Sequence, residues 1–583
     1  MTLPRLLILS LLISFGWINY ANANALVIDV RSLDGREQTL LQTLGQELSL
    51  ALLKQDQYPA QTDFLFRLAP KELQARLQAR GYYQAQIEPH LQRSANETRA
   101  RFDVRLGPAV LMRELRLNIR GEGANLQAWQ TYREYDLRLQ NAKIFTHQDY
   151  ESTLQDLLNL AHNNGYLDAR FSQREFHVYP ERERVEVFIT LDTGEAYRFG
   201  TVRFNGQQRV SETLLHRFVE FDSNDAFNQN TLFDLQQHLI GSRYFGMVRV
   251  LPNFQAVEDN TIPVTVDLEE NPPHRYKLGA GYGTDSGARL LLGFENRLVN
   301  SRGHRYELDS LIGQNKQLIN VTYAMPGTRP SRQQWLIGIG WDASQSDQLK
   351  RNRASLVPEY VYQMDNGWLV KPYLSLERET YQYRAQPKRT TQVVVTGINL
   401  QKRVANNDSY TTQGYRHQLG LRTSIGQLWS DSEFAQLELS SKGIISPRPS
   451  WRFIARARAV LTQADRQQTL PSSYRYLLGG ELLRGFAFES IGVTNKQGQI
   501  EGANNMLLGS IESDLRFSKY LGAALFTDIG QVYNTEPNSH FKQGAGIGLR
   551  GFTPIGIIRL DMAWPISEQV RPWHFHLSIG LDL

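Results

Sequence analysis

The 583-residue sequence contains no cysteine. Disulfide frameworks, thiolate metal sites and cysteine nucleophiles are therefore excluded. There is also no large excess of one charge, because 64 Lys and Arg residues face 59 Asp and Glu residues. Without a dense basic stretch, the charge pattern does not indicate nucleic-acid binding.

Motifs of common enzymes are missing as well. There is no Gly-x-Ser-x-Gly elbow, no His-Glu-x-x-His and no Gly-x-x-x-x-Gly-Lys loop. The twelve histidines are scattered, and His574 and His576 alternate on a strand without a nearby acidic cluster. We expect these two to be lumen or turn residues, not metal ligands. The sequence thus predicts a non-enzymatic protein without a cofactor.

Long apolar runs are confined to the amino terminus. Arg5 precedes the short apolar run Leu6–Phe15, and alanines alternate with asparagines over Ala21–Ala25. This order is typical of a secretory signal, predicted here as residues 1–25, although a retained membrane anchor is the alternative. No later run of about eighteen apolar residues predicts a helical membrane span.

The chain repeats itself after the signal. Gly81, Gly165 and Gly246 lie 84 and 81 residues apart. Leucines at helical spacing precede each glycine, and an alternating strand follows each. Gly81 and Gly165 are expected to end their helices. We predict three tandem α+β modules at 26–109, 110–196 and 197–273, with chance similarity between unrelated segments as the alternative.

The pattern changes at Pro272 and Pro273, since two prolines cannot continue a hydrogen-bonded ladder. Alternating segments such as Trp335–Trp341 and Trp451–Arg458 follow, apolar on one side and small or cationic on the other. A soluble sandwich would show the same alternation. Aromatic residues at strand ends and the near absence of helical pattern favour a transmembrane β-barrel over 274–583, with about sixteen antiparallel strands.

The final segment, Trp573–Leu583, alternates as well. Its apolar residues share one face, and the chain stops on this strand. A barrel whose last strand closes against its first would end in this way.

Arg484 lies in the glycine-framed run Gly479–Phe486, and Phe526, Asp528 and Gly530 follow it about forty residues later. Residues at i, i+2 and i+4 share one face of a strand. If that face lines the lumen, Asp528 is a confined carboxylate with Arg484 as its natural bidentate partner. An arginine beside glycine can also be a solvent-exposed turn residue.

The first expected barrel strand, Tyr276–Gly283, has glycines at successive same-face positions: Gly279, Gly281 and Gly283. Glycine weakens a strand interior. Two interpretations remain open, curvature at a barrel corner or a weak seam between the first and last strands, where Gly580 adds a second soft point.

These residues together resemble the BamA/TamA superfamily of outer-membrane assembly proteins, in which polypeptide-transport-associated (POTRA) modules precede a barrel. Leu483-Arg484-Gly485-Phe486 is similar to the motif of its sixth extracellular loop, with leucine in place of valine. Phe526-x-Asp528-x-Gly530 is similar to the barrel-wall motif, and Gly544–Asp561 resembles the penultimate strands. The final Leu583 departs from the aromatic that ends many outer-membrane proteins.

Three modules resemble the TamA branch, whereas BamA has five. This resemblance implies a latch of Arg484, Gly485 and Phe486 on the wall residues, and a TamB-like inner-membrane-anchored partner. It also implies clients that are nascent β-barrels, including autotransporters, in the outer membrane of a Gram-negative-type cell. The modules would lie in the periplasm.

The resulting hypothesis is strand templating at the seam, with a client strand pairing on the open edge of the first strand among outer-membrane lipids. A polypeptide-secretion pore of the two-partner type is the first rival. A plain porin or barrel enzyme with periplasmic appendages is the second.

Overall fold

The computed structural model describes residues 24–283, 287–384, 386–407, 410–424, 429–464, 470–535, 540–553, 556–569 and 572–580. The predicted signal lies outside this range except for Asn24 and Ala25, which begin the first strand. Contacts divide the chain into two compact units, one holding the first two modules and the other holding most of the third module with the barrel. Among the described helices, none is long and apolar enough to cross a membrane.

The first module packs two main helices on a four-stranded sheet of order β2-β1-β4-β3. Strand β4 is central and pairs in parallel with β1 and antiparallel with β3. Its inward residues Ala100, Phe102 and Val104 are buried against Leu73 and Leu77 of α2. The elements are β1 (Asn24–Ser32), α1 (Gln38–Gln46), β2 (Gln55–Asp56), α2 (Pro59–Gln78), β3 (Gln86–Arg93) and β4 (Glu97–Arg105).

The second and third modules repeat this arrangement. Their sheet orders, β5-β7-β6 and β8-β10-β9, again put the last strand of each module in the centre. Thr146 caps α4 by accepting a hydrogen bond from the Asp149 backbone N–H at 3.0 Å. The elements are β5 (Leu111–Arg120), α3 (Gln127–Thr131), α4 (His147–Asn163), β6 (Arg170–Tyr179), β7 (Arg184–Asp192), β8 (Arg198–Asn205), α5 (Glu212–His216), α6 (Gln229–Gly241), β9 (Phe245–Pro252) and β10 (Thr261–Glu270).

The residue that ends the main helix differs between the first two modules and the third. Gly81 and Gly165 follow α2 and α4 with positive φ angles of 92° and 89°, as helix-ending glycines do. In the third module the left-handed position belongs to Arg243, with φ 68°, whereas Gly246 lies inside β9. Gly246 is therefore not the counterpart of the other two glycines. The shared landmark is the buried tyrosine that follows each turn: Tyr82, Tyr166 and Tyr244.

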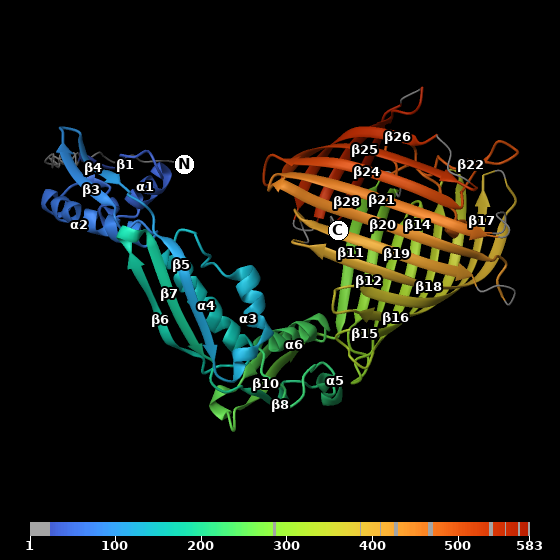
Figure 1. Ribbon diagram of the computed structural model, residues 1–583. Helices are drawn as coiled ribbons and strands as arrows, with labels where there is room; N and C mark the ends of the chain where they lie inside the picture. Colours follow the sequence, from blue (N-terminus) through green and yellow to red (C-terminus); the bar gives the residue numbers. More distant parts are fainter. Residues whose placement is uncertain are drawn as a thin grey trace, which may run out of the picture. The chain divides into compact units, whose positions relative to one another are not determined.

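The C-terminal region forms a 16-stranded antiparallel sheet that curls into a nearly closed barrel, so the predicted fold class is confirmed (Figure 1). Neighbouring strands along the chain pair throughout. The strands are β11 (His274–Gly283), β12 (Gly287–Asn296), β13 (Arg305–Gly313), β14 (Lys316–Pro326), β15 (Gln333–Gln345), β16 (Leu349–Gln363), β17 (Leu369–Tyr383), β18 (Arg389–Ala405), β19 (Gly414–Ser424), β20 (Phe434–Arg448), β21 (Trp451–Ala464), β24 (Asn505–Arg516), β25 (Leu521–Tyr533), β26 (Lys542–Thr553), β27 (Gly556–Pro565) and β28 (His574–Gly580).

Alternation separates the two faces of the barrel wall. On β15 the outward residues Trp335, Ile337 and Ile339 are exposed, as suits a lipid-facing surface. On β21 the side chain of Arg452 points to the other face and is completely buried. The interior therefore holds charged groups that must pair with one another.

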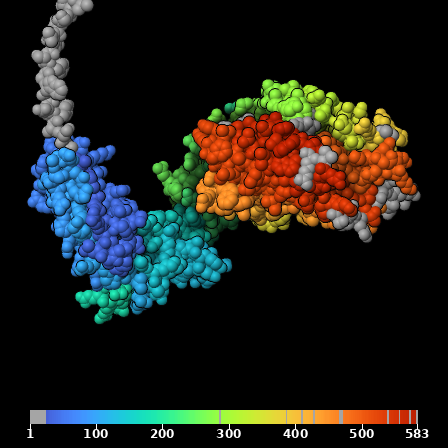
Figure 2. All heavy atoms as spheres, turned by 90° about the horizontal axis from the view of Figure 1, so that it is seen from above, coloured from blue at the N-terminus to red at the C-terminus, as the bar shows by residue number. Residues whose placement is uncertain are grey.

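The first and last barrel strands lie side by side without a ladder in the described residues. Strand β11 pairs only with β12, and β28 only with β27. The two strands nevertheless approach each other, and the light-green surface of the first barrel strands borders the red surface of the last (Figure 2). The sheet therefore has two adjacent edges at this seam.

The third module contacts the barrel turns at the start of β13 and β15. The Tyr244 hydroxyl donates to the carbonyl oxygen of Gly303 at 2.6 Å. Glu220 forms an ion pair with Arg332 at 2.8 Å, and Arg243 pairs with the buried Glu295 at 3.0 Å. Glu295 is only 1% exposed, so the ion pair between the third module and the end of β12 involves a desolvated carboxylate.

Candidate functional site: a loop held against the inner barrel wall

The connection between β21 and β24 is long and lies against the barrel wall. It contains a short hairpin of β22 (Val493–Thr494) and β23 (Ile500–Glu501). At its start, the Ser472 backbone N–H donates to Glu379 of β17 at 2.6 Å. The Tyr474 hydroxyl donates to Glu377 of the same strand at 2.8 Å. The loop is therefore fastened to the wall well before it reaches Arg484.

Arg484 and Asp528 form a bidentate pair. The Arg484 Nε and Nη2 atoms lie 2.8 and 2.9 Å from the two Asp528 carboxylate oxygens. The Arg484 backbone N–H donates to the same carboxylate at 3.1 Å. Asp528 is 1% exposed and Arg484 is 4% exposed. The guanidinium also stacks on Phe526, 3.4 Å from the ring centroid, so both wall residues hold the same cation.

Two further carboxylates contact Arg484 that the sequence reasoning missed. Its Nη1 atom lies 2.9 Å from Glu512 of β24 and 2.8 Å from Asp561 of β27. Register explains the convergence, because Glu512 pairs with Phe526, and Asp561 pairs with Gly548. Each carboxylate occupies an inward position of its own strand, a signal that alternation carries in the sequence. Which strands lie opposite each other is set only by the folded sheet.

The extra carboxylates are balanced by a second buried arginine. Arg550 of β26 lies 2.7 Å from Glu512 and 2.5 Å from Asp561. Arg452 extends the network through Asp514 at 2.7 Å. Such buried charges are tolerated only when they are paired, and deletion of one partner leaves an uncompensated charge.

Strand β26 provides room for the loop backbone. Gly544 lies directly opposite Asp528 in the sheet. A Cβ at Gly544 would collide with the carbonyl oxygen of Arg484. The absence of a side chain at Gly544 therefore lets the loop backbone pack directly against β26; this contact is called the Gly544 seat.

The remaining loop residues contact the last strand and an apolar cluster. The Gly485 backbone N–H lies 3.2 Å from Nε2 of His576 on β28. Phe486 packs in a buried cluster with Leu478 and Leu483 of the loop. Gly530 of β25 lies next to Leu478, whose Cδ1 is 3.1 Å from where a Cβ would be. His576 is thus a lumen-facing contact of the loop, as expected for a lumen residue.

The predicted seam glycines lie apart from this loop. Gly279, Gly281 and Gly283 alternate with the exposed Leu278 and Tyr282 on β11. They pair with Leu291, Arg289 and Gly287 of β12. Gly580 pairs with Ile557 of β27. Within the described ranges, no group of three or more His, Asp or Glu residues is arranged to hold a metal ion.

Comparison with known proteins gives matches to three family models. Residues 299–582 match the Omp85 superfamily domain. Residues 32–106 match the POTRA domain described as TamA domain 1. Residues 197–271 match a POTRA family described as a surface antigen variable number repeat.

Individual relatives are distant. Outer membrane protein assembly factor BamA of Neorickettsia risticii (strain Illinois) is 20% identical over 471 residues, 74% of this chain and 61% of that protein. BamA of Buchnera aphidicola subsp. Acyrthosiphon pisum (strain APS) is 20% identical over 147 residues, 25% of this chain and 24% of that protein. The chain thus spans less than two thirds of the length of either relative.

A solved structure agrees in fold. The crystal structure of BamA from Haemophilus ducreyi lacking POTRA domains 1–3 has a TM-score of 0.61 and 15% identity. The similarity covers 81% of this chain and all of that one.

The barrel and the repeated modules define an outer-membrane β-barrel protein with periplasmic POTRA domains. Within it, the barrel over residues 299–582 is similar to the Omp85 superfamily domain.

Proposed function

We propose that this protein is an assembly factor of TamA type, which inserts β-barrel proteins such as autotransporters into the outer membrane. The observation that carries the proposal is the seam, where two strand edges adjoin without a ladder in the described residues. An unpaired edge can template an incoming strand through main-chain hydrogen bonds. BamA, an outer membrane protein assembly factor, is similar in sequence and fold.

The latch allows the seam to open without loss of the barrel. Arg484 joins the loop to β24, β25 and β27 through three carboxylates, and Gly485 reaches β28. Those strands would move as one block on the side of the seam that ends the chain. The loop's contacts with Glu377 and Glu379 then connect this block to β17 across the lumen.

The reaction is a non-enzymatic exchange of strands and needs no cofactor. Burial of the client's apolar face in lipid drives it downhill. The three modules would offer docking edges to clients and to a TamB-like partner anchored in the inner membrane. The match of residues 32–106 to the POTRA domain described as TamA domain 1 supports the TamA type.

A disulfide across the seam tests the mechanism. The chain has no native cysteine, so single pairs such as Leu278→Cys with Phe575→Cys, scanned along β11 and β28, report only the seam. We expect the oxidised pair to abolish client assembly in vivo or in proteoliposomes, and reduction to restore it.

The matched control is Leu308→Cys with Val321→Cys, which are opposite residues on the already paired strands β13 and β14. This pair should leave assembly unchanged when oxidised. Normal assembly by the seam-locked protein would contradict strand templating and favour passage of clients through the lumen.

A further inference from the structure

The outward end of the barrel can be assigned from the third module. This periplasmic module contacts the turns between β12 and β13 and between β14 and β15, through Gly303 and Arg332. Strands alternate in direction, so the turns that follow β13, β15 and β17 lie at the opposite end. Those turns face the outer leaflet of the membrane.

The outer face of β14–β17 changes character towards that end. Ile339, Leu356 and Leu376 form one apolar row across three strands. The next outward row holds Trp341, Ala354 and Arg378. The last two rows are polar: Ala343, Asn352 and Thr380, then Gln345, Lys350 and Gln382. An aromatic residue between apolar and polar rows is typical of the membrane interface, so the polar rows lie at headgroup level.

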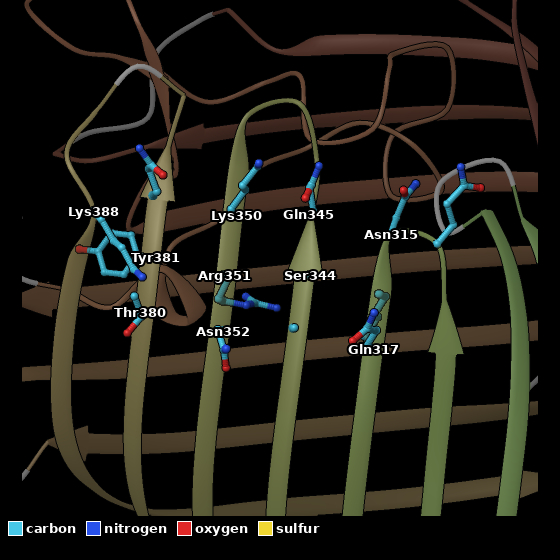
Figure 3. Close-up of a pocket in the computed structure, with 14 residues that line it drawn as sticks. Asn315, Gln317, Ser344, Gln345, Lys350, Arg351, Asn352, Thr380, Tyr381 and Lys388 are labelled. Carbon is cyan, nitrogen blue, oxygen red and sulfur yellow. The ribbon is translucent and has the colours of Figure 1, made fainter.

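A basic cleft of about 440 Å³ lies in these polar rows. Its cations are Lys316, Lys350, Arg351 and Lys388, and none of the described lining residues is Asp or Glu. Figure 3 shows Lys350 and Asn352 on one strand, with Gln345 and Thr380 on its two neighbours and Lys388 beyond. Arg351 has a partner, because Asp342 lies 3.7 Å from it.

Lys316 and Arg351 both lie opposite Ser344, which alternates with the outward-facing Ala343 and Gln345, so neither belongs to the outer rows. Lys350 and Lys388 are the remaining cations of the cleft. Across the described part of the chain, no carboxylate lies within 4.0 Å of their ammonium groups. Cations on one outer surface without a counter-charge favour an anionic ligand.

An apolar cleft of about 490 Å³ adjoins the basic cleft along β16 and β17. It is lined by Ile339, Leu356, Leu376, Val394 and Trp429, among others. Trp429 comes from the loop between β19 and β20 and is 79% exposed. A soluble anion would gain nothing from contact with these apolar side chains, whereas a lipid acyl chain would pack against them.

We propose that the two clefts together bind one outer-leaflet lipid, with its phosphate-bearing headgroup on Lys350 and Lys388 and an acyl chain beside Trp429. The amides and hydroxyls of Asn352, Gln382 and Thr380 provide neutral donors around the headgroup. The site lies on the lipid-facing surface of β14–β18. It is separate from the latch and from the seam, and it does not depend on the proposed function.

The experiment is a binding titration on the purified full-length protein in dodecyl maltoside micelles, with tryptophan fluorescence as the readout. The probes are bisphosphorylated lipid A, its dephosphorylated form and inorganic phosphate. Lys350→Gln with Lys388→Gln should weaken binding of bisphosphorylated lipid A about tenfold or more, since each lysine near a membrane surface contributes substantially to anionic lipid binding. Trp429→Ala should weaken lipid A binding several-fold without affecting the response to inorganic phosphate.

The matched control is Lys402→Gln with Lys519→Gln, which removes the same charge at the periplasmic end. Heat-modifiable mobility on gels checks that every variant is folded. The proposal is overturned if the double variant binds bisphosphorylated lipid A like the unchanged protein, or if the dephosphorylated lipid binds equally well. Inorganic phosphate that binds as tightly as the lipid would show a soluble-anion site and would overturn the lipid assignment.

Discussion

Arg484 shows what a single side chain can decide in this molecule. The spacing of Arg484, Phe526 and Asp528 suggested a bidentate pair on a strand face, with a solvent-exposed turn arginine as the alternative, and the structure brings these residues together. The sequence did not predict Glu512 or Asp561 as partners. Those contacts depend on strand register, which places residues 28 and 77 positions away on the same guanidinium.

Gly544 offers a sharp test of the seat beneath Arg484. In Gly544→Ala the new methyl group meets a backbone carbonyl that cannot rotate away, so the loop should lift from the wall. We expect faster protease cleavage of the loop in the folded barrel. Gly551→Ala on the same strand is the control, because its Cβ would meet Ile558 at an ordinary 3.5 Å. Equal cleavage of the two variants would contradict the seat.

Among the secondary-structure elements, the helices and strands of the modules follow apolar periodicity closely. The helices over Leu73 and Leu77 and over Leu154 and Leu157 are α2 and α4. The third module, predicted at 197–273, overlaps the POTRA match at 197–271. Only its glycine is not equivalent to the other two, because Arg243 adopts the left-handed conformation and Gly246 lies in β9. The buried tyrosines after each turn, and not the glycines, therefore mark the equivalent position in all three modules.

The end of β10 carries a pH-dependent contact. Burial acts to raise the pKa of Glu270, but hydrogen bonds from the backbone N–H groups of Arg209, Gln208 and Val210 and from the Arg209 side chain lower it to about 2. A carboxyl with a lowered pKa stabilises the fold above its unfolded pKa of about 4.3. This stability is lost as the pH falls from about 4.3 towards about 2.

The loop 207–210 should therefore resist pepsin at pH 4 and become cleavable as the pH approaches 2. Glu270→Gln removes the charge and should make the loop cleavable already at pH 4. The neighbouring Glu269→Gln, an exposed position, is the control and should behave like the unchanged protein. Cleavage of both variants at the same pH would mean that Glu270 does not hold the loop.

In the molecule as a whole, the buried charges connect the loop to the C-terminal strands. Glu512, Asp514, Asp528 and Asp561 face Arg452, Arg484 and Arg550 inside one wall. Each strand contributes one or two of these groups, and none is satisfied by its own strand alone. Loss of one of these charged groups therefore leaves unpaired charges on several strands.

Arg484→Ala should destabilise the barrel by about 3–5 kcal/mol, the usual cost of leaving a buried charge without its partner. The readout is the urea midpoint of tryptophan fluorescence for the full chain in detergent. Lys496→Ala, an exposed cation of the same loop, is the control and should change the midpoint little. A small effect of Arg484→Ala would show that the remaining arginines, Arg550 and Arg456, are sufficient to hold the carboxylates.

The sequence by itself determined the repeated modules and the alternation of the barrel strands, and it indicated the pairing of Arg484 with Asp528. These features depend on local periodicity and on residues whose chemistry leaves few partners. Only the tertiary structure decided the seat at Gly544, the network around Glu512 and the basic cleft above Trp341. Each of these joins residues from separate strands, and sheet register, which is set by the closing of the whole barrel, determines which residues meet.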